Sequence, residues 1–387
     1  MKEENWIDKY MRYTNNTETS DLFREWVGVS VLASVLQRKI WLDLGHLIVY
    51  PNMYIVLIGP PGKARKGTAI KPGLKLLNEL GIQLGAESIT REQIIRRMVA
   101  ARKVISLPED DSIISHSSFT VIAPELTVFL GYNNPKFLSD LTDWFDCADT
   151  WRYETKNMGI DEIVGVWFNL LGATTPGLLQ SALPQDAIGG GLTSRMIFVY
   201  SDGAGKIVPI PFITPEELKL REDILIELEE RYVMSGIIKP TKEFLEAWVD
   251  WRYYAETHKP FDVEILMPYV ERRPIHLLKL SLIMNAARTT SLILDVQDLE
   301  AAKNLLERTE KLMPKAFSGI GARSDATILE NMMTTIARLK SVDYKILRHK
   351  FLFDTDEDQF DKMLQSLESI GYIRRRISTD KYIIELK

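Results

Sequence analysis

Apolar residues gather in short continuous runs that are separated by segments with helical periodicity. Four of these runs are rich in β-branched and aromatic residues: YIVLI (54–58), FTVIAPEL (119–126), GVWFNLLGATTP (165–176) and RMIFVY (195–200). Runs of this kind are typical of strands buried on both faces, as in a parallel sheet that helices cover on both sides. The pattern therefore predicts an α/β fold with a parallel sheet at its core.

The segments around these runs complete the expected core. Helices are predicted over 19–38, 68–80, 90–103 and 135–149. Shorter patterns predict a hairpin over 39–50 that turns at Gly45, a strand over 81–89, a polar connection over 109–118, an exposed hairpin over 150–166, a short helix over 176–183 and a flexible loop over 189–195.

The alternation of strands and helices stops after residue 205. A Gly- and Pro-rich linker follows, and residues 214–318 read as helices almost throughout. Residues 325–387 show three helical stretches and then two alternating strands around Ser378–Asp380, which is the winged-helix pattern. We therefore expect four parts: an N-terminal helical segment with a small hairpin (1–50), a core (51–205), a helical region (206–320) and a winged-helix domain (321–387).

Composition narrows the classes of protein that fit. The chain has 387 residues, a formal net charge of −5 and a single cysteine. A global basic field for nucleic acid is excluded, so any such surface must be local. One cysteine and five histidines give neither a disulfide framework nor a zinc spacing. No apolar stretch approaches the ~18 residues of a membrane span, and no signal peptide is recognised. These features predict a cytoplasmic protein without a membrane partner.

The stretch GPPGKARKGT, after the first apolar run, has the order of a phosphate-binding loop. Glycines let backbone N–H groups turn toward phosphate oxygens, the next helix adds its dipole, and a lysine reaches the β- and γ-phosphates. The count is one residue longer than G-x-x-x-x-G-K-[ST]. We expect ATP at Gly59, Pro60, Pro61, Gly62, Lys63, Arg65, Lys66, Gly67 and Thr68. Lys66 is the first choice for the phosphate lysine, Lys63 and Arg65 are reserves, and Thr68 is the candidate Mg²⁺ ligand. The alternative is a basic turn without a ligand.

Polar residues at the ends of other apolar runs are the catalytic candidates. Glu125 is the candidate base that activates water, although Pro124 stands where a metal-binding Asp is expected. Thr174 or Thr175, which the sequence does not separate, is the candidate that positions this water, with Asn169 as an alternative. Arg195 follows three glycines and is the candidate arginine finger from a neighbouring subunit. Each of these residues could instead serve as a cap, a turn residue or a structural ion pair.

Basic residues beside aromatic ones suggest contacts to nucleic acid. The hairpin at 150–166 combines Lys156, Asn157 and Arg152 with Trp151 and Tyr153, which suits a phosphate backbone and stacked bases. In the last domain, Arg374 and Arg376 share one face of a strand, and Lys381 follows. The candidate recognition helix there, EDQFDKMLQSLESI, is acidic, which weakens DNA reading by that helix. Solvated turns and protein contacts are the alternatives.

The order of these parts resembles an AAA+ P-loop ATPase. A hairpin before the Thr-ended strand is similar to the pre-sensor-1 insertion of superfamily 3 and minichromosome-maintenance helicases, whose tip lysine grips DNA in a ring's channel. That resemblance assigns the tip to Lys156. The stretch RRPIHLLKLSLIMNAAR is similar to the helical lid of the minichromosome-maintenance proteins, where an arginine acts on the neighbour's ATP; here this would be Arg273, or Arg272.

More closely, the chain resembles phage- and prophage-encoded P-loop proteins, through YPNMYIVLIGPPG, APELTVFLG, DWFDCADTWRYETKNMG, NLLGATTPGLLQSALP and GGGLTSRMIFVY. The resemblance implies a ring-forming replicative helicase of a mobile element, expected to be a hexamer, that uses ATP and Mg²⁺ to move on single-stranded DNA beside a primase or polymerase. Two other functions remain open: a helicase loader or DNA-remodelling ATPase without unwinding activity, and a non-catalytic scaffold for DNA replication.

Overall fold

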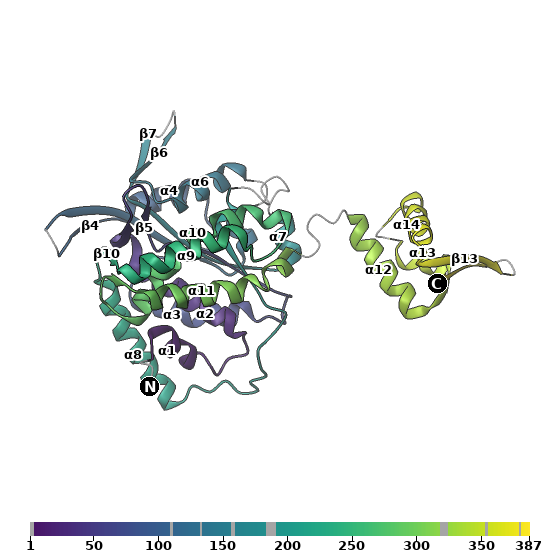
Figure 1. Cartoon of the computed structure of the whole chain (residues 1–387), viewed down its shortest axis with the longest axis horizontal. Coiled ribbons are helices and arrows are strands. Elements are labelled where there is room, and N and C mark those ends of the chain that lie inside the picture. The colour runs from purple at the N-terminus through teal and green to yellow at the C-terminus, as the bar shows by residue number, and fades with distance from the viewer. Residues whose placement is uncertain are drawn as a thin grey trace. The chain divides into compact units, whose positions relative to one another are not determined.

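The chain folds into two compact units, Met1–Ala316 and Phe317–Lys387 (Figure 1). The computed structural model describes residues 4–108, 111–131, 134–155, 159–182, 191–317, 324–352, 355–378 and 381–387. The regions expected over 1–50, 51–205 and 206–320 fall together in the first unit, apart from the last few residues.

A five-stranded sheet forms the centre of the first unit, in the order β4-β5-β8-β3-β9. Its strands are β3 (Tyr54–Ile58), β4 (Arg102–Ser106), β5 (Ile113–Ala123), β8 (Val166–Thr174) and β9 (Met196–Tyr200). Strands β5, β8, β3 and β9 run parallel, and β4 pairs antiparallel with β5. Every residue of β3, β8 and β9 is buried, as the continuous apolar runs predict. The predicted α/β fold is confirmed, with a mixed sheet rather than a purely parallel one.

Neighbouring residues of β8 show that helices cover both faces of this sheet. The Phe168 ring packs against Trp144 of α6 (Pro135–Phe145) at 5.3 Å between centroids. The next residue, Asn169, donates hydrogen bonds toward Ser30 and Ser34 of α2 (Asp21–Leu36). Because successive side chains of a strand point to opposite faces, α6 and α2 lie on opposite sides of the sheet.

The β4–β5 hairpin differs from the prediction. The expected helix over 90–103 ends earlier, as α4 (Arg91–Ala100), and the expected polar connection over 109–118 contains the start of β5. The β-branched residues Val104, Ile105, Ile113 and Ile114 suit paired strands, and cross-strand pairing outweighs the local helical pattern. The strand expected over 81–89 is reduced to a single parallel bridge between Leu84 and Thr120.

A second, smaller sheet has the order β11-β10-β1-β2. Strands β1 (Ile40–Asp43) and β2 (Ile48–Val49) form the hairpin predicted to turn at Gly45, which has a φ of +81°. Strands β10 (Gly236–Pro240) and β11 (Ile293–Leu294) lie in the region predicted to be almost entirely helical. The sequence does not predict these two strands, because a strand of two to five residues shows too little periodicity by itself. Their pairing with neighbouring strands identifies them.

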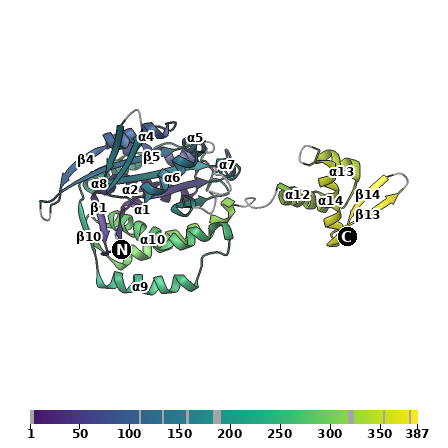
Figure 2. The same ribbon diagram turned by 90° about the horizontal axis from the view of Figure 1, so that it is seen from above.

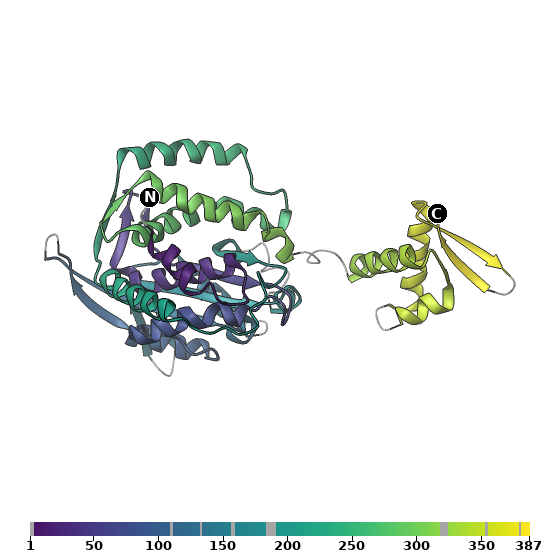
Figure 3. The same ribbon diagram turned by 90° about the horizontal axis from the view of Figure 1, so that it is seen from below.

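Helices fill the rest of the first unit. They are α1 (Trp6–Tyr13), α3 (Lys66–Glu79), α5 (Leu126–Leu130), α7 (Pro176–Ala182), α8 (Pro215–Tyr232), α9 (Lys242–Thr257), α10 (Met267–Arg288) and α11 (Val296–Glu310). Helix α10 is buried along most of its length and packs against α11 and α2. Helix α9 lies along the outside of the unit, beside α11 (Figures 2 and 3).

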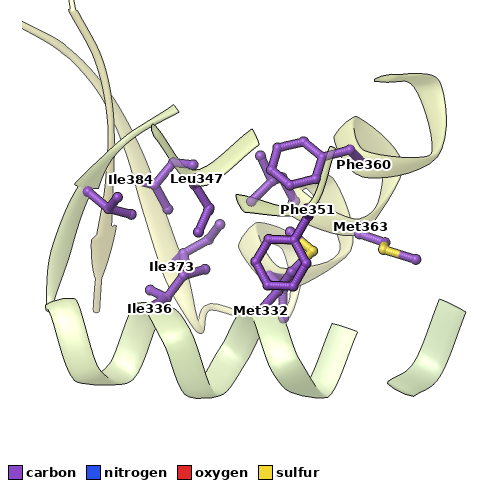
Figure 4. Packing of buried hydrophobic residues seen from close by; sticks show 11 residues of the cluster. Met332, Ile336, Leu347, Phe351, Phe360, Met363, Ile373 and Ile384 are labelled. Atoms are coloured by element: carbon purple, nitrogen blue, oxygen red, sulfur yellow. The ribbon is translucent and has the colours of Figure 1, made fainter. Parts of the chain in front are cut away.

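Within its described residues, the second unit contains three helices and an antiparallel sheet. Its elements are α12 (Ser324–Leu339), β12 (Ser341–Asp343), α13 (Tyr344–Lys350), α14 (Glu357–Ser369), β13 (Ile373–Ser378) and β14 (Lys381–Leu386), with strand order β12-β14-β13. Its core includes Met332 and Ile336 of α12, Phe360 of α14, Ile373 of β13 and Ile384 of β14 (Figure 4). The core therefore holds these two helices against the sheet. The three helices and two long strands match the sequence pattern, and β12 is an additional strand.

Candidate functional site

Three parallel strands end side by side next to the glycine-rich loop. Ile58, the last residue of β3, pairs with Thr174 of β8 on one side and with Tyr200 of β9 on the other. On the far side of β8, Ala123 of β5 pairs with Gly172, which places Glu125 just beyond the same edge. Ligands of open α/β sheets bind at the carboxyl ends of the strands, so the carboxyl ends of β3, β8 and β5 form the candidate site.

The loop from Gly59 to Arg65 is tightly folded. A Cβ atom on Gly59 would lie 2.5 Å from the Ser201 carbonyl oxygen and 2.6 Å from the Ala64 Cβ, so only glycine fits there. Gly62 has a φ of +67°, a conformation that glycine adopts at no steric cost. Ala64 is fully buried within the loop, and its backbone N–H donates a hydrogen bond to the Pro60 carbonyl oxygen at 3.3 Å. The longer spacing of the motif is therefore accommodated by one compact turn.

Lys66 is the first residue of α3, and its side chain folds back over the loop. Its Nζ donates a hydrogen bond to the Gly59 carbonyl oxygen at 2.7 Å and lies 3.5 Å from the Pro60 carbonyl oxygen. Burial lowers the pKa of Lys66, and the Glu125 carboxylate partly opposes this shift. The ammonium group is thus held among the loop carbonyls, near the one carboxylate that the sequence singles out.

The two reserve residues face elsewhere. Arg65 adopts a left-handed conformation, with a φ of +51°, and its guanidinium pairs with Glu18 at 3.1 Å. Lys63 lies against Gly203, where an added Cβ would be 3.8 Å from the Lys63 Cγ. Of the three basic residues, Lys66 is the one whose charged group the loop surrounds.

The start of α3 offers unpaired donors. Within the described part of the chain, the backbone N–H groups of Arg65, Lys66 and Gly67 donate no hydrogen bond to another residue. Such groups at a helix N-terminus, with the positive end of the helix dipole, favour an anion. Thr68, in the first turn, is half-buried, and its N–H donates to the Arg65 carbonyl at 3.0 Å.

Glu125 and the two threonines occupy distinct positions at this edge. Glu125 is exposed at the start of α5, where its side chain makes no capping hydrogen bond. Thr174 is buried beside Ile58, whereas the Thr175 hydroxyl accepts the Leu178 N–H at 3.3 Å and caps α7. Thr174 is therefore the threonine next to the loop. Asn169 is fully buried five positions back along β8, accepts the Met53 N–H and has a structural role.

Arg195 lies at the opposite end of the parallel strands from the loop, directly before the first residue of β9. The residue after it, Met196, pairs with Tyr54 at the start of β3, and β3 separates that point from Gly59 by about 16 Å. The Arg195 side chain is 8% exposed, forms an ion pair with Asp146 and donates to the Gly191 carbonyl at 2.8 Å. A finger would have to leave these contacts, so the structure does not present Arg195 to a neighbouring subunit.

The two arginines at the start of the lid-like stretch differ in exposure. Arg273 is buried, and its guanidinium makes a bidentate ion pair with Glu310 of α11, at 2.6 and 2.8 Å. Arg272 is 31% exposed and lies 3.4 Å from Asp146 and 3.2 Å from the Ser194 hydroxyl. Arg273 therefore joins two helices of its own subunit, and its predicted contact with a neighbour's ATP does not fit this arrangement. Arg272 is the accessible alternative.

The hairpin expected over 150–166 is present as β6 (Thr150–Thr155) and β7 (Gly159–Val164). It extends beyond the rest of the first unit, as does the β4–β5 hairpin (Figure 1). Lys156 and Asn157, the predicted DNA contacts, lie outside the described residues. Arg152 pairs across the hairpin with Glu162 at 2.6 Å, while the Arg91 guanidinium lies 4.5 Å from the Tyr153 ring centroid.

In the second unit, Arg374 and Arg376 are exposed on one face of β13, as the alternation predicts. Arg375 points the other way and pairs with Glu368 of α14 at 2.6 Å. Lys381 is the first residue of β14. The two exposed guanidinium groups are thus available to a partner.

The residues at the candidate site fit ATP together with a Mg²⁺ ion that is held largely by the nucleotide. Among the described residues, no three His, Cys, Asp or Glu side chains are grouped to hold a metal ion alone. Mg²⁺ commonly takes its ligands from nucleotide phosphates, water and one or two protein oxygens, of which the Thr68 hydroxyl could supply one. The half-buried Lys66 ammonium group and the N–H groups at the start of α3 fit the phosphates themselves.

Sequence reasoning missed four charged residues around the site and at the opposite end of the strands, namely Glu18, Lys315, Asp202 and Asp146. Glu18 holds Arg65, Lys315 pairs with Asp202 just after β9, at 3.0 Å, and Asp146 joins Arg195 to Arg272. These pairs link residues far apart in the sequence, so no local motif could have indicated them.

Comparison with protein-family models gave no match, and comparison with curated proteins gave none either. None of the described helices combines the length and the apolar character that a bilayer crossing requires.

Proposed function

We propose that this chain is an ATP hydrolase of the AAA+ type that moves on single-stranded DNA, a helicase or translocase of a phage or other mobile element. The observation that carries the proposal is the position of Lys66. Its ammonium group lies inside a glycine-rich turn, at a helix N-terminus, beside the ends of two neighbouring parallel strands that carry Thr174 and Glu125.

Each residue at this edge has a definite task in the proposal. Lys66 and the free N–H groups of the first turn of α3 bind the β- and γ-phosphates. The Thr68 hydroxyl would hold Mg²⁺, which would neutralise charge on the phosphates. Glu125 accepts a proton from the attacking water, and the buried Thr174 hydroxyl orients that water. The exposure of Glu125 leaves its carboxylate free for this task.

A ring of identical subunits, expected to be a hexamer, completes the site. Arg272 lies at the sheet edge away from its own loop, so in the proposal it serves the ATP of the next subunit. The shared carboxylate of Asp146 holds Arg272 near Arg195, which keeps two guanidinium groups at that edge. The planar Arg272 guanidinium suits the developing negative charge of phosphoryl transfer, whereas Arg195 stays paired with Asp146.

The composition of the β6–β7 hairpin is the reason for proposing single-stranded DNA as the molecule along which the protein moves. Its strands combine Arg152 with Trp151 and Tyr153, and basic plus aromatic residues can follow a single strand without reading its sequence. The overall charge of −5 is compatible with such a local surface, which would make binding sensitive to salt. Arg374 and Arg376 of the second unit are further candidates for phosphate contacts.

Strand displacement with ATP tests this function. The full-length protein should unwind a tailed duplex, and Lys156→Ala should abolish unwinding while ATP hydrolysis continues. Lys136→Ala, an exposed lysine of α6, is the matched control and should unwind like the wild type. ATP hydrolysis without unwinding would favour a loader or remodelling ATPase. A wild type that neither hydrolyses nor responds to ATP would favour a scaffold.

A further inference from the structure

A pocket lies between the small sheet and the foot of the β6–β7 hairpin, away from the candidate nucleotide site. Its volume is about 270 Å³. Its walls come from three places: the β1–β2 region, the start of β5, and the two residues that flank the hairpin. The lining residues that matter here are Arg38, Trp41, Tyr50, Ser115, His116 and Asp149. This volume is close to the lower end of the range for small-molecule sites, roughly 300–1,000 Å³, so the pocket suits one small planar group.

Two aromatic rings form one side of the pocket. The Trp41 and Tyr50 centroids are 6.4 Å apart, and the rings are tilted by 41°. The Arg38 guanidinium lies 4.4 Å from the Tyr50 centroid and covers that ring. Trp41 is half-buried, so it is the ring that keeps surface for a guest. An indole face stacks with any base, because every base has a π-face.

The polar groups of the pocket suit a neutral guest rather than a free anion. Arg38 is buried and fixed by the carbonyls of Ala148 and Val166, at 2.7 and 3.0 Å. It also pairs with Asp149 at 2.6 Å, so its charge is already balanced. The Asp149 side chain is 96% exposed, and a carboxylate has more acceptor sites than one guanidinium N–H occupies.

One lining residue, His116, has a ring nitrogen without a hydrogen-bond partner among the described residues. His116 is fully buried; its Nδ1 contacts the Ser118 hydroxyl at 2.8 Å, while its Nε2 has no hydrogen-bond partner among the described residues. A buried polar atom of this kind is costly unless something satisfies it. Ser115 adds a hydroxyl group, and the exposed Arg102 reaches it at 3.5 Å.

We propose that this pocket receives one unstacked base of the single-stranded nucleic acid that the hairpin engages. The inference rests on the proposed function and extends it to a base-binding site. Asp149 and Gly165 join the pocket directly to the two strands of the hairpin, so a strand held by the hairpin passes its mouth. The exposed Arg102, which lies 3.5 Å from the Ser115 hydroxyl, can neutralise the phosphate next to the inserted base. The base stacks on Trp41, and Asp149 accepts a hydrogen bond from its polar edge.

The test uses full-length protein and a thymidine oligonucleotide that carries one fluorescent 2-aminopurine. Wild type should quench the fluorescence, as stacking does, and Trp41→Ala should lose the quenching and bind about 5- to 100-fold more weakly. Trp248→Ala, which removes another half-buried tryptophan on α9, is the control and should behave like the wild type. Ser115→Phe fills the pocket without removing Trp41 and should also abolish quenching.

Further experiments distinguish a failure of the base-binding pocket from a failure of the proposed DNA function. An abasic oligonucleotide should bind wild type and Trp41→Ala equally, because it offers phosphates but no base. If wild type binds the oligonucleotide and both Trp41→Ala and Ser115→Phe bind and quench identically, the pocket is not a base site although the DNA function stands. If 2-aminopurine riboside is quenched but the oligonucleotide is not, the pocket takes a free nucleoside and the inference is wrong. Failure of wild type to bind any oligonucleotide overturns the inference together with the DNA function.

Discussion

The Lys66 ammonium donates a hydrogen bond of 2.7 Å to the carbonyl oxygen of Gly59, seven residues earlier in the chain. This contact closes the glycine-rich turn on itself. It also places a positive charge near the start of α3, where three backbone N–H groups have no partner among the residues that the structure describes. When phosphate oxygens bind, they can replace the Gly59 carbonyl as the acceptor, so the same lysine serves the empty and the occupied loop.

Replacing Glu125 should separate binding from hydrolysis. Glu125→Gln keeps the size of the side chain but removes the base, so ATP should still bind while hydrolysis falls by about 10²- to 10⁴-fold. Glu87→Gln, at an exposed position, is the control and should leave both unchanged. The measurements are ATP titration by calorimetry and steady-state phosphate release. Equal hydrolysis by Glu125→Gln and wild type would remove Glu125 from the mechanism.

Gly59→Ala should destabilise the first unit. The added methyl group would meet the Ser201 carbonyl oxygen at 2.5 Å, and backbone must shift to admit it. We expect a lower melting temperature, with a loss of about 1–3 kcal/mol in the free energy of unfolding. Gly67→Ala adds a methyl group to open space in the first turn of α3 and should be neutral or slightly stabilising. Thermal unfolding of the two variants side by side decides the matter, and equal melting temperatures would contradict the tight packing at Gly59.

Arg273 and Arg272 should differ in their effect on stability. Arg273→Ala leaves the buried Glu310 carboxylate without its bidentate partner, which costs about 3–5 kcal/mol. Arg272→Ala removes a partly exposed contact and should cost at most about 1 kcal/mol. Denaturant unfolding measures both. A small effect of Arg273→Ala would reopen its role as an arginine that contacts a neighbour.

Acid should weaken the fold through His276. Burial lowers the pKa of this histidine to about 4, below the value of about 6.5 in an unfolded chain. Between these values the unfolded chain binds more protons, so the free energy of unfolding decreases as the pH falls from about 6.5 to about 4. The loss is on the order of 3 kcal/mol.

The melting temperature at pH 7 and at pH 5 measures this dependence. His276→Gln keeps a donor for the Ser194 carbonyl but cannot be protonated, so its melting temperature should fall less on acidification than that of the wild type. His258 is exposed, and His258→Gln should behave like the wild type. An unchanged pH dependence in His276→Gln would show that other groups cause the acid sensitivity.

The strands that carry the candidate site were predictable because each is a continuous apolar run, and their parallel pairing follows from burial on both faces. Strand β10 was not predictable, since it pairs with β1 and β11, which are far away in the sequence. The β4–β5 hairpin was missed because the start of β4 continues the helical pattern of residues 90–103. Similarly, adjacent arginines 272 and 273 look alike in the sequence. Their roles separate only when the helix turns one toward Glu310, 37 residues away, and leaves the other beside Asp146.

ATP hydrolysis by Lys66→Ala tests the central claim most directly. The wild type should hydrolyse ATP in the presence of Mg²⁺, and Lys66→Ala should reduce the rate by about 10²- to 10³-fold, because the loop loses the charge that faces the phosphates. Lys71→Ala, which removes an exposed lysine from the same helix, should hydrolyse ATP like the wild type. A Lys66→Ala protein that hydrolyses ATP as fast as the wild type, or a wild type that hydrolyses none, would contradict the account.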